Sequence, residues 1–354
     1  MAALMAGAAL SAFSASPVSS VRWLEKDYDF GLMKEVAGPK TGQSRFVNAG
    51  RDTLSITDVR PSCGCTSAVF TETPLAPGDT AVIRYTYDPA MRPGKFAKHV
   101  RVNLSDGTHA SIAIKGNVLG TPESLSTLYP VEAGMLRLSD AVLGLGDVTW
   151  GRAPMTFVNA YSLSPDTIAP TARTDVKGLT LKQSDRKAGP GDIVTFSINF
   201  DSRAVGRYGD VEMPVTVSDG AGGEATVSVR AFVTPDTEYL LMKQNGRNPG
   251  ADLATDVIEL GEGITGGTLR REITLRNSGD GPLEILGVSC PSEAFTFRTP
   301  PKPARPGRGM TLKMEVDVSR LPSGPFRIPV KIVTNDPARP VLTVSAAGIR
   351  GNDK

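Results

Sequence analysis

The sequence repeats one unit three times, and this repetition restricts the folds open to the chain more than any other feature. Each unit begins with a strand-like segment that ends on glycine, at Gly31, Gly146 and Gly261, and successive glycines are 115 residues apart. A fixed period of this kind indicates repeated structural units. We therefore expect three homologous domains in tandem.

Four further landmarks follow each glycine in the same order. They are an asparagine that closes a strand, a Pro-Gly turn, an aspartate that closes the next strand, and a glycine that opens a Val/Ile-rich strand. They lie at 48, 77–78, 88 and 94 in the first unit, at 159, 190–191, 201 and 206 in the second, and at 277, 306–307, 317 and 324 in the third.

Each unit has the pattern of a β-sandwich. It contains about seven short apolar segments with turn residues roughly every 8 to 12 positions. In the segment 82–87, the side chains of Ile83, Tyr85 and Tyr87 share one face, which we expect to pack into a core. The sequence therefore predicts an all-β fold of three tandem immunoglobulin-like β-sandwich domains.

The predicted sandwiches occupy residues 22–119, 129–234 and 251–350, with polar, turn-rich boundaries at 120–128 and 235–250. Glycine (37) and proline (27) are abundant. Together they make up about 18% of the chain, which is below the roughly 25–30% of low-complexity sequences. We therefore assign them to the turns of folded domains.

The formal net charge of +2 provides no broad field that would hold a polyanion. We expect no binding of nucleic acid. After the N-terminal segment, no stretch approaches the roughly 18 uninterrupted apolar residues of a transmembrane helix, so we also expect no integral membrane segment in the mature chain.

The N-terminal segment predicts export. Residues 1–13 are small and apolar and run into Ser14-Ala15-Ser16-Pro17, which is typical of a signal-peptide core followed by a cleavage zone. We predict a signal peptide over residues 1–16 and a location in the periplasm or at the cell surface. The basic residues that usually precede such a core are missing, and the alternative is an uncleaved apolar terminus.

The first unit resembles a known family. The motifs that carry the resemblance are Asp29-Phe30-Gly31, Phe46-Val47-Asn48-Ala49-Gly50, Pro61-Ser62-Cys63-Gly64-Cys65-Thr66, Pro77-Gly78-Asp79 and Gly116-Asn117-Val118. They are similar to domain of unknown function 1573, a family carried mainly by exported Bacteroidota proteins. The resemblance implies an immunoglobulin-like sandwich related to the major sperm protein and an envelope location, but no activity. The second unit has no cysteine, and the third has Cys290 near the same place.

The Cys63-Gly64-Cys65 run permits three interpretations. In an extended chain both sulfurs would share one face with their Cα atoms about 7 Å apart, and a turn at Gly64 would bring them closer. A disulfide here would be strained and easily reduced, which suits redox exchange. Two thiolates could hold Cu(I). The interpretation we favour is that two small side chains pack at a strand end.

The two histidines are not expected to complete a metal site. A hairpin that keeps the apolar residues on one face pairs Ser105 with His109 around residues 106–108. His99 and His109 then face solvent, six residues or roughly 20 Å apart. We predict no catalytic residues, no metal or cofactor-binding residues and no cofactor, with Cys63 and Cys65 as the one speculative thiol or copper site.

These patterns favour a non-catalytic structural or protein-interaction protein of the cell envelope that binds a protein partner. Glycine-rich runs at 144–146 and 220–223 are not followed by helical patterns, so we interpret them as turns rather than nucleotide loops. The main alternative is a thiol-dependent envelope protein that uses Cys63 and Cys65 for disulfide exchange or copper binding. A further alternative is an intracellular filament-associated protein of the major sperm protein type.

Overall fold

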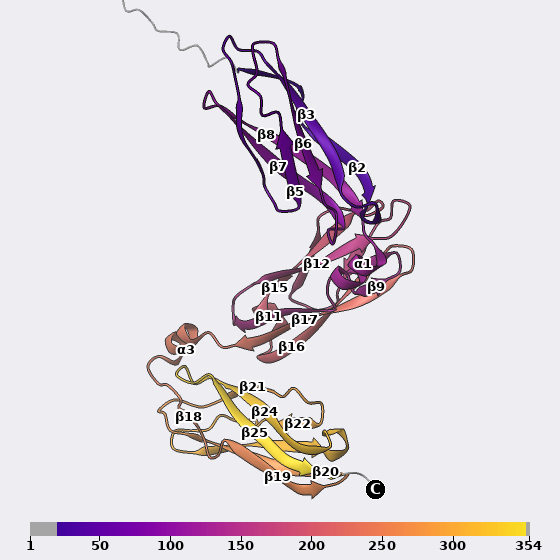
Figure 1. Cartoon of the computed structure of the whole chain (residues 1–354). Coiled ribbons are helices and arrows are strands. Elements are labelled where there is room, and N and C mark those ends of the chain that lie inside the picture. Colours follow the sequence, from indigo (N-terminus) through magenta and orange to yellow (C-terminus); the bar gives the residue numbers. More distant parts are fainter. Residues whose placement is uncertain (1–19, 352–354) are drawn as a thin grey trace, which may run out of the picture. The chain divides into compact units, whose positions relative to one another are not determined.

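A computed structural model describes residues 20–351 (Figure 1). Its strands form six sheets, which pair into three β-sandwiches and confirm the predicted all-β fold class. The described chain divides into two compact units, one formed by residues 20–128 with 190–193 and the other by residues 129–189 with 194–351. The predicted signal peptide, residues 1–16, lies outside the described residues.

The first sandwich consists of two four-stranded sheets. One sheet has the order β1 (Val21–Glu25), β3 (Lys40–Asn48), β6 (Thr80–Tyr87) and β5 (Thr66–Phe70). The other has the order β2 (Tyr28–Lys34), β8 (His109–Leu119), β7 (Gly94–Leu104) and β4 (Ile56–Pro61). The short helical segments η1 (Glu35–Ala37) and α1 (Pro122–Leu128) follow β2 and β8. Ile83, Tyr85 and Tyr87 of β6 are fully buried, as predicted.

The second sandwich pairs a five-stranded sheet with a four-stranded one. The larger sheet has the order β14 (Leu179–Gln183), β15 (Ile193–Phe200), β12 (Met155–Ser162), β10 (Leu136–Leu138) and β9 (Val131–Ala133). The smaller has the order β11 (Val142–Thr149), β17 (Glu224–Thr234), β16 (Gly209–Ser218) and β13 (Thr171–Arg173). The helix α2 (Ser202–Val205) follows β15.

The third sandwich again consists of two four-stranded sheets. One has the order β18 (Ala251–Leu253), β20 (Thr268–Asn277), β23 (Gly309–Asp317) and β22 (Phe295–Arg298). The other has the order β19 (Val257–Ile264), β25 (Val341–Arg350), β24 (Gly324–Thr334) and β21 (Ile285–Ser289). The segment η2 (Val318–Arg320) follows β23.

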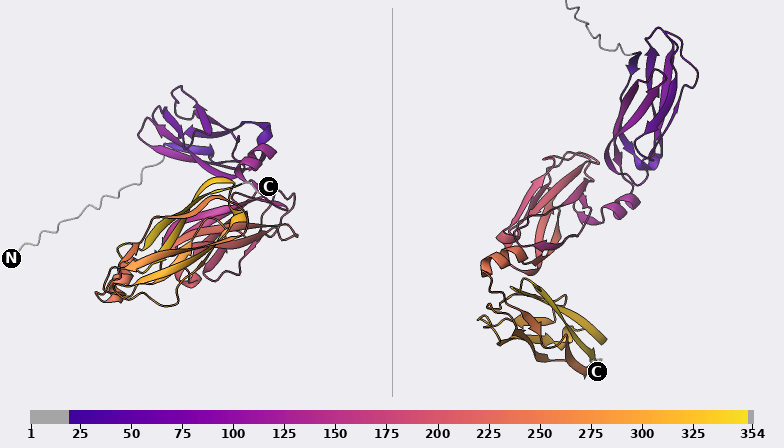
Figure 2. Two further views of the ribbon diagram at one scale, coloured as in Figure 1. Left: turned by 90° about the horizontal axis from the view of Figure 1, so that it is seen from below. Right: turned by 90° about the vertical axis from the view of Figure 1, so that its left-hand side faces the viewer.

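The chain enters the third sandwich through α3 (Thr237–Gln244), the short salmon helix in Figure 2. It is the longest helix within residues 20–351, and its eight residues fall well short of the about 20 that span a bilayer.

The repeated glycines mark a β-bulge. Gly31, Gly146 and Gly261 lie inside β2, β11 and β19, and each of these strands pairs in parallel with the last strand of its sandwich. The prediction that the strands end at these glycines and the predicted turn at 144–146 are wrong, because each strand continues past its glycine. Each ladder shifts register beside its glycine. The three glycines have positive φ angles of 66°, 65° and 121°, a region that favours glycine. The glycines therefore recur every 115 residues because each parallel strand pair needs a residue with positive φ at its bulge.

Buried asparagines tie two loops together in the first and third sandwiches. The Asn48 amide nitrogen donates to the carbonyl oxygens of Asp52 and Leu75, both at 2.9 Å, and its oxygen accepts from the backbone N–H of Gly50 at 3.0 Å. Asn277 makes corresponding bonds to Gly281, Ala304 and Gly279. Both asparagines are at most 1% exposed.

Two predicted landmarks of the second unit are wrong, each by three residues. Gly206 ends α2, and the strand that it was expected to open, β16, begins at Gly209. The other is Asn159. β12 continues to Ser162, which pairs with Leu136 at the place where Asn48 pairs with Val21. The Asn159 side chain instead accepts a hydrogen bond from the Thr195 hydroxyl at 2.7 Å, on the neighbouring strand. The buried Ser162 hydroxyl has no hydrogen-bond partner among residues 20–351. The serine side chain is shorter than asparagine, so the second sandwich lacks the hydrogen bonds that join the two loops in the other sandwiches.

Each sandwich also carries an aspartate in the hairpin before its last strand. Asp106 accepts a hydrogen bond from the Ser20 hydroxyl, and Asp336 accepts one from the Ala251 N–H. Asp219 lies in the corresponding hairpin of the second sandwich, two residues earlier by strand pairing. The hairpins at Asp106 and Asp219 are confirmed, but the sequence did not reveal these ties, because their partners lie 84 to 86 residues away.

Asp219 shows how such a carboxylate is held by backbone groups. It is 3% exposed and accepts from the backbone N–H groups of Met135, Ala221 and Gly223 at 2.9, 2.7 and 2.9 Å. Burial alone would raise its pKa, but these hydrogen bonds outweigh burial and hold the pKa of Asp219 below its ordinary value. The ionised form therefore stabilises the folded second sandwich.

Replacing Asn48 with alanine should destabilise the first sandwich by about 3 kcal/mol, because three hydrogen bonds are lost and buried backbone groups lose partners. The measurement is urea unfolding followed by fluorescence of Trp23, which packs against Phe46, in a Trp150→Phe background. The matched control is Ser162→Ala, followed by Trp150 in a Trp23→Phe background. Because the Ser162 hydroxyl is unpaired, we expect a change of at most about 0.5 kcal/mol. Equal losses at both sites would contradict this account.

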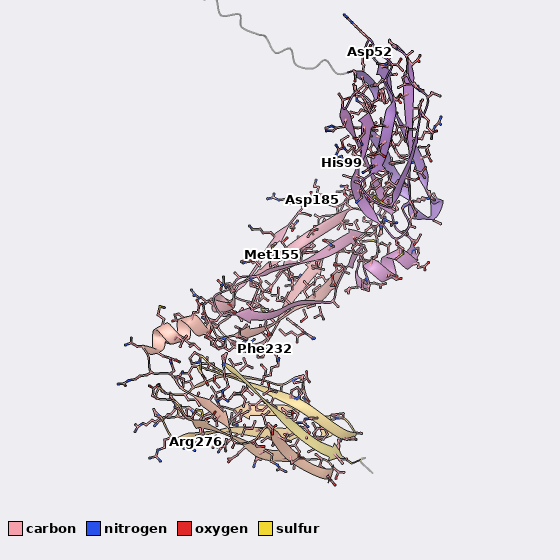
Figure 3. The ribbon with its side chains drawn as sticks, turned by 60° about the vertical axis from the view of Figure 1, so that its left-hand side comes forward. Asp52, His99, Met155, Asp185, Phe232 and Arg276 are labelled. Atoms are coloured by element: carbon pink, nitrogen blue, oxygen red, sulfur yellow. A yellow bond between two sulfur atoms is a disulfide. The ribbon has the colours of Figure 1, made fainter. Side chains whose placement is uncertain are left out.

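The second sandwich should lose stability in acid through Asp219. Because the pKa of Asp219 is lower in the folded state, its contribution is fully present above the unfolded-state pKa of about 3.9 and disappears as the pH falls through the folded-state pKa. Asp219→Asn should lower stability at pH 7 and flatten the acid dependence, measured by Trp150 fluorescence in urea at several pH values. Asp185→Asn, at an exposed loop position, should leave both unchanged (Figure 3).

Candidate functional site

The Cys-Gly-Cys run forms a turn that crosses from one sheet of the first sandwich to the other. It leaves β4 at one sheet edge and enters β5 at the edge of the facing sheet. The Ser62 N–H donates to the carbonyl oxygen of His99 at 2.8 Å, and the Asp88 N–H donates to that of Cys65 at 2.9 Å. The turn is thus fixed to both layers of the sandwich.

Cys63 and Cys65 are joined by a disulfide, and their Cα atoms are 5.3 Å apart. The separation is shorter than the roughly 7 Å of an extended chain. The turn at Gly64 that we expected is present, and the Thr66 N–H donates to the carbonyl oxygen of Cys63 at 3.3 Å. In this oxidised form neither sulfur is a thiolate, so copper binding would require reduction first.

The disulfide lines a cavity of about 370 Å³, in the size range of small-ligand sites. Cys65 is 8% exposed and belongs to the core, whereas Cys63 is half-buried. Gly64 is exposed, and a side chain at this position would meet no atom within 4 Å. The remaining walls come from Tyr87, Arg92, Pro93, Lys95, Phe96 and Lys98.

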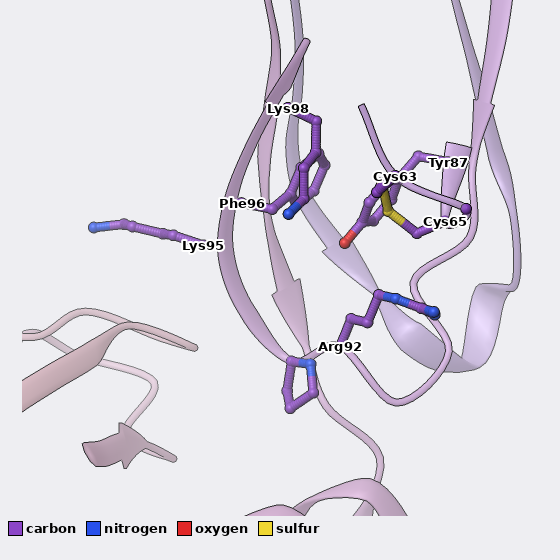
Figure 4. A pocket seen from close by; sticks show the side chains of 9 residues that line it. Cys63, Cys65, Tyr87, Arg92, Lys95, Phe96 and Lys98 are labelled. Carbon is purple, nitrogen blue, oxygen red and sulfur yellow. A yellow bond between two sulfur atoms is a disulfide. The ribbon is translucent and has the colours of Figure 1, made fainter. Parts of the chain in front are cut away.

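Two aromatic rings form the floor of the cavity. Tyr87 from one sheet and Phe96 from the other stack with their centroids 3.8 Å apart. Burial raises the pKa of Tyr87 against the opposing charge of Arg92, which keeps the phenol neutral at physiological pH. Figure 4 shows these two rings gathered with Lys98 beside the disulfide and Arg92 on the other side of the opening.

The cavity is positively charged. Arg92, Lys95 and Lys98 line it, and no acidic residue within the described part of the chain contributes to its walls. The Lys95 ammonium points away and pairs with Asp192 at 3.0 Å, so the charge of the cavity comes from Arg92 and Lys98 (Figure 4). The Arg92 guanidinium donates to the carbonyl oxygen of Ala90 at 2.6 Å, which keeps it beside the opening without neutralising it. Cations close to a disulfide stabilise a thiolate formed by reduction and attract anionic ligands.

A buried carboxylate holds the loop that carries Arg92. Glu35 accepts from the N–H of Met91 at 2.7 Å, from the N–H of Thr121 at 2.8 Å and from the Ser124 hydroxyl at 2.5 Å. Met91 has a φ of 55°, which is rare for a residue other than glycine. Burial would raise the pKa of Glu35, but these hydrogen bonds outweigh it and keep its pKa below the ordinary value. Glu35 thus positions one wall of the cavity.

The two histidines lie outside the cavity. Both are exposed, as predicted, and His99 is labelled at the surface in Figure 3. The predicted hairpin register is wrong by two residues, because Asn103 rather than Ser105 pairs with His109. Residues 105–108 form a longer turn, in which the Asp106 carboxylate accepts from the backbone N–H of Thr108. The histidines are therefore four residues apart along β7, about 13 Å rather than 20 Å.

Metal ligands do not gather elsewhere in residues 20–351, where no group of three or more His, Cys, Asp or Glu side chains could hold an ion. Cys290 is half-buried and forms no disulfide, and burial raises the pKa of its thiol. By strand pairing it corresponds to Pro61 rather than to Cys63. The third cysteine is therefore no counterpart of the motif.

The sequence led to the disulfide turn but not to the rest of the cavity. Arg92 and Lys98 carried no motif, and Tyr87 and Phe96 were assigned only to the repeated frame of the strands. The four come together because β6, β7 and the loop between them meet beside the turn. In the sequence, only the closeness of these four residues to the repeated landmarks Asp88 and Gly94 indicated that they lie near one another.

Replacing both Cys63 and Cys65 with alanine should leave the first sandwich folded. The chain-entropy relation gives about 1.6 kcal/mol for a disulfide that closes three residues, much less than for a long loop. We expect a loss of about 2 kcal/mol in urea unfolding followed by Trp23 fluorescence, and a similar loss when the wild-type chain is reduced. An unfolded first sandwich in either case would show that the disulfide is an essential staple.

The solved structures to which this chain is similar are distant from it. A protein of unknown function from Porphyromonas gingivalis W83 is 17% identical with a TM-score of 0.48, and the alignment covers 61% of this chain and 100% of that one. The PapD-like domain 7 of human CEP192 is 8% identical with a TM-score of 0.24, covering 29% of this chain and 88% of that domain.

No curated protein matches the chain. Residues 21–118 match the family model described as Protein of unknown function (DUF1573), which confirms the resemblance inferred from the motifs of the first unit and assigns the first sandwich to that family.

Proposed function

We propose that this chain is a non-catalytic structural or protein-interaction protein of the cell envelope. The observation that carries the proposal is that all six described sheets are open, so each ends in two edge strands. The outer backbone groups of an edge strand can pair with an extended segment of another chain. The predicted leader and the exported family that the first unit resembles support the envelope location.

The proposal is tested by photo-crosslinking in living cells of the natural host. A crosslinking amino acid is placed at exposed positions of the edge strands, one strand at a time, and on a sheet centre as the control. We expect discrete adducts with an envelope protein from at least one edge and none from the control. A chain that keeps residues 1–16, remains in the cytoplasm and forms no adduct from any edge would refute the proposal.

A second candidate is a thiol-dependent envelope protein, favoured by the position of the disulfide. Cys63 borders a cavity that also carries Arg92 and Lys98, and such cations lower thiol pKa values and promote exchange. The disulfide closes only three residues, so stability alone is a weak reason for it. Under this hypothesis an incoming thiolate attacks one sulfur, the other leaves as a thiolate, and a second thiol of the reductant completes the exchange.

The two candidates differ in what the Cys63→Ala/Cys65→Ala variant retains. An interaction role predicts unchanged crosslinks in the cell. A thiol role predicts loss of function in the cell, together with exchange between the purified chain and glutathione at neutral pH, seen as an intact mass that gains and loses two hydrogens. Native mass spectrometry of the reduced chain with Cu(I) tests the copper form, and an unchanged mass would exclude it.

A further inference from the structure

The three sandwiches contain equivalent edge strands that can be compared residue by residue. β5, β14 and β22 each lie at the edge of a sheet and pair antiparallel with β6, β15 and β23. Their first residues pair with the residue just before the repeated aspartate: Thr66 with Tyr87, Leu179 with Phe200, and Phe295 with Val316. The repeat thus provides an internal control for each edge position.

The fourth residue of these strands differs in charge, which determines whether another strand can pair with the edge. It is Lys182 in β14 and Arg298 in β22, but Val69 in β5, and all three are exposed. Charged side chains on an edge strand prevent other strands from pairing with it. Val69 is 64% exposed, and β5 contains no charged residue and no proline. Among these three equivalent edges, only that of the first sandwich lacks a charge.

The uncharged edge leads directly into the positive cavity. β5 begins at Thr66, immediately after Cys65, which lines the cavity with Arg92 and Lys98. Val69 is four residues from Cys65, about 13 Å along an extended chain. A segment paired with β5 therefore reaches Arg92 and Lys98 within a few residues, and the cross-strand neighbour of Val69, Arg84, adds a further positive charge.

We propose that β5 is a docking edge for an extended segment of another protein, with a small apolar residue opposite Val69 and an acidic residue beside the Cys63–Cys65 turn. Main-chain hydrogen bonds to β5 would supply much of the affinity, and the cations of the cavity would select the acidic side chain. This inference rests on the interaction role proposed above and names the edge and the chemistry of the partner.

A second copy of this chain fits the edge less well. Two β5 strands would pair over five residues only, which buries far less than the roughly 1,200 Å² of a stable interface. Within its five residues a second β5 also has no acidic side chain, and the nearest one, Glu72, lies two residues beyond Phe70. The charge of the cavity therefore favours a different, acidic chain.

The test uses the full chain and a fluorescein-labelled peptide, Asp-Asp-Thr-Val-Thr-Val-Thr, with binding followed by fluorescence anisotropy. Val69→Lys introduces the charge that the sister strands carry and should weaken binding at least about tenfold. Val36→Lys, at a position 79% exposed outside any strand, is the matched control and should bind as the wild type does. Arg92→Glu and a Lys-Lys counterpart of the peptide should each weaken binding by a similar factor.

Three results would overturn the inference. They are unchanged binding by Val69→Lys, equal binding of the acidic and basic peptides, and dimerisation of the chain through β5 that the peptide does not compete with. The failure of this inference is distinguishable from failure of the proposed function. Crosslinks in the cell from other edge strands, with none from β5, would reject the docking edge alone, whereas the absence of crosslinks from every edge would reject the interaction role.

Discussion

The side-chain period of two governs the architecture of all three sandwiches. Alternate residues of every strand must enter the space between two sheets, so each strand can change its pairing only by an even number of residues without exposing its apolar face. The hairpin of β7 and β8 illustrates this constraint, because its register differs by two residues from the expected one and yet leaves the same residues buried. Hydrogen bonds of buried polar side chains such as Asn48 and Asp219 then fix the loops, whose conformation the alternation of apolar residues does not determine.

The sequence predicted the features that depend on neighbouring residues. Three copies, the all-β class, the buried face of β6 and the exposure of both histidines follow from local alternation and from the turn residues of each unit. The asparagine predicted for the second unit was wrong because Phe157-Val158-Asn159 resembles Phe46-Val47-Asn48 in sequence. The pairing with β10 puts Ser162, not Asn159, at the position equivalent to Asn48. A local pattern cannot show which strand lies alongside.

The cavity could not be predicted for the same reason. Its walls come from segments that meet only after the two sheets have packed, and neither Arg92 nor Lys98 belongs to a motif. Comparing equivalent positions of the three repeats identifies features that no sequence motif marks. The second and third sandwiches lack the disulfide turn and carry a charge on the strand equivalent to β5, whereas the first sandwich has the disulfide turn directly before an uncharged β5. The distinctive chemistry of the chain is therefore concentrated on one side of one sandwich.

The parallel pairing of β2 with β8 has a consequence for how the chain folds. An early strand of each sandwich pairs in parallel only with the last strand: β2 with β8, β11 with β17 and β19 with β25. Contacts so far apart in sequence form slowly, and during synthesis they cannot form until the whole unit has been made. Each sandwich is therefore completed from its C-terminal end. A nascent chain interrupted before the last strand of the first sandwich leaves β2 and β7 without the strand that lies between them, as additional edges that other chains can join.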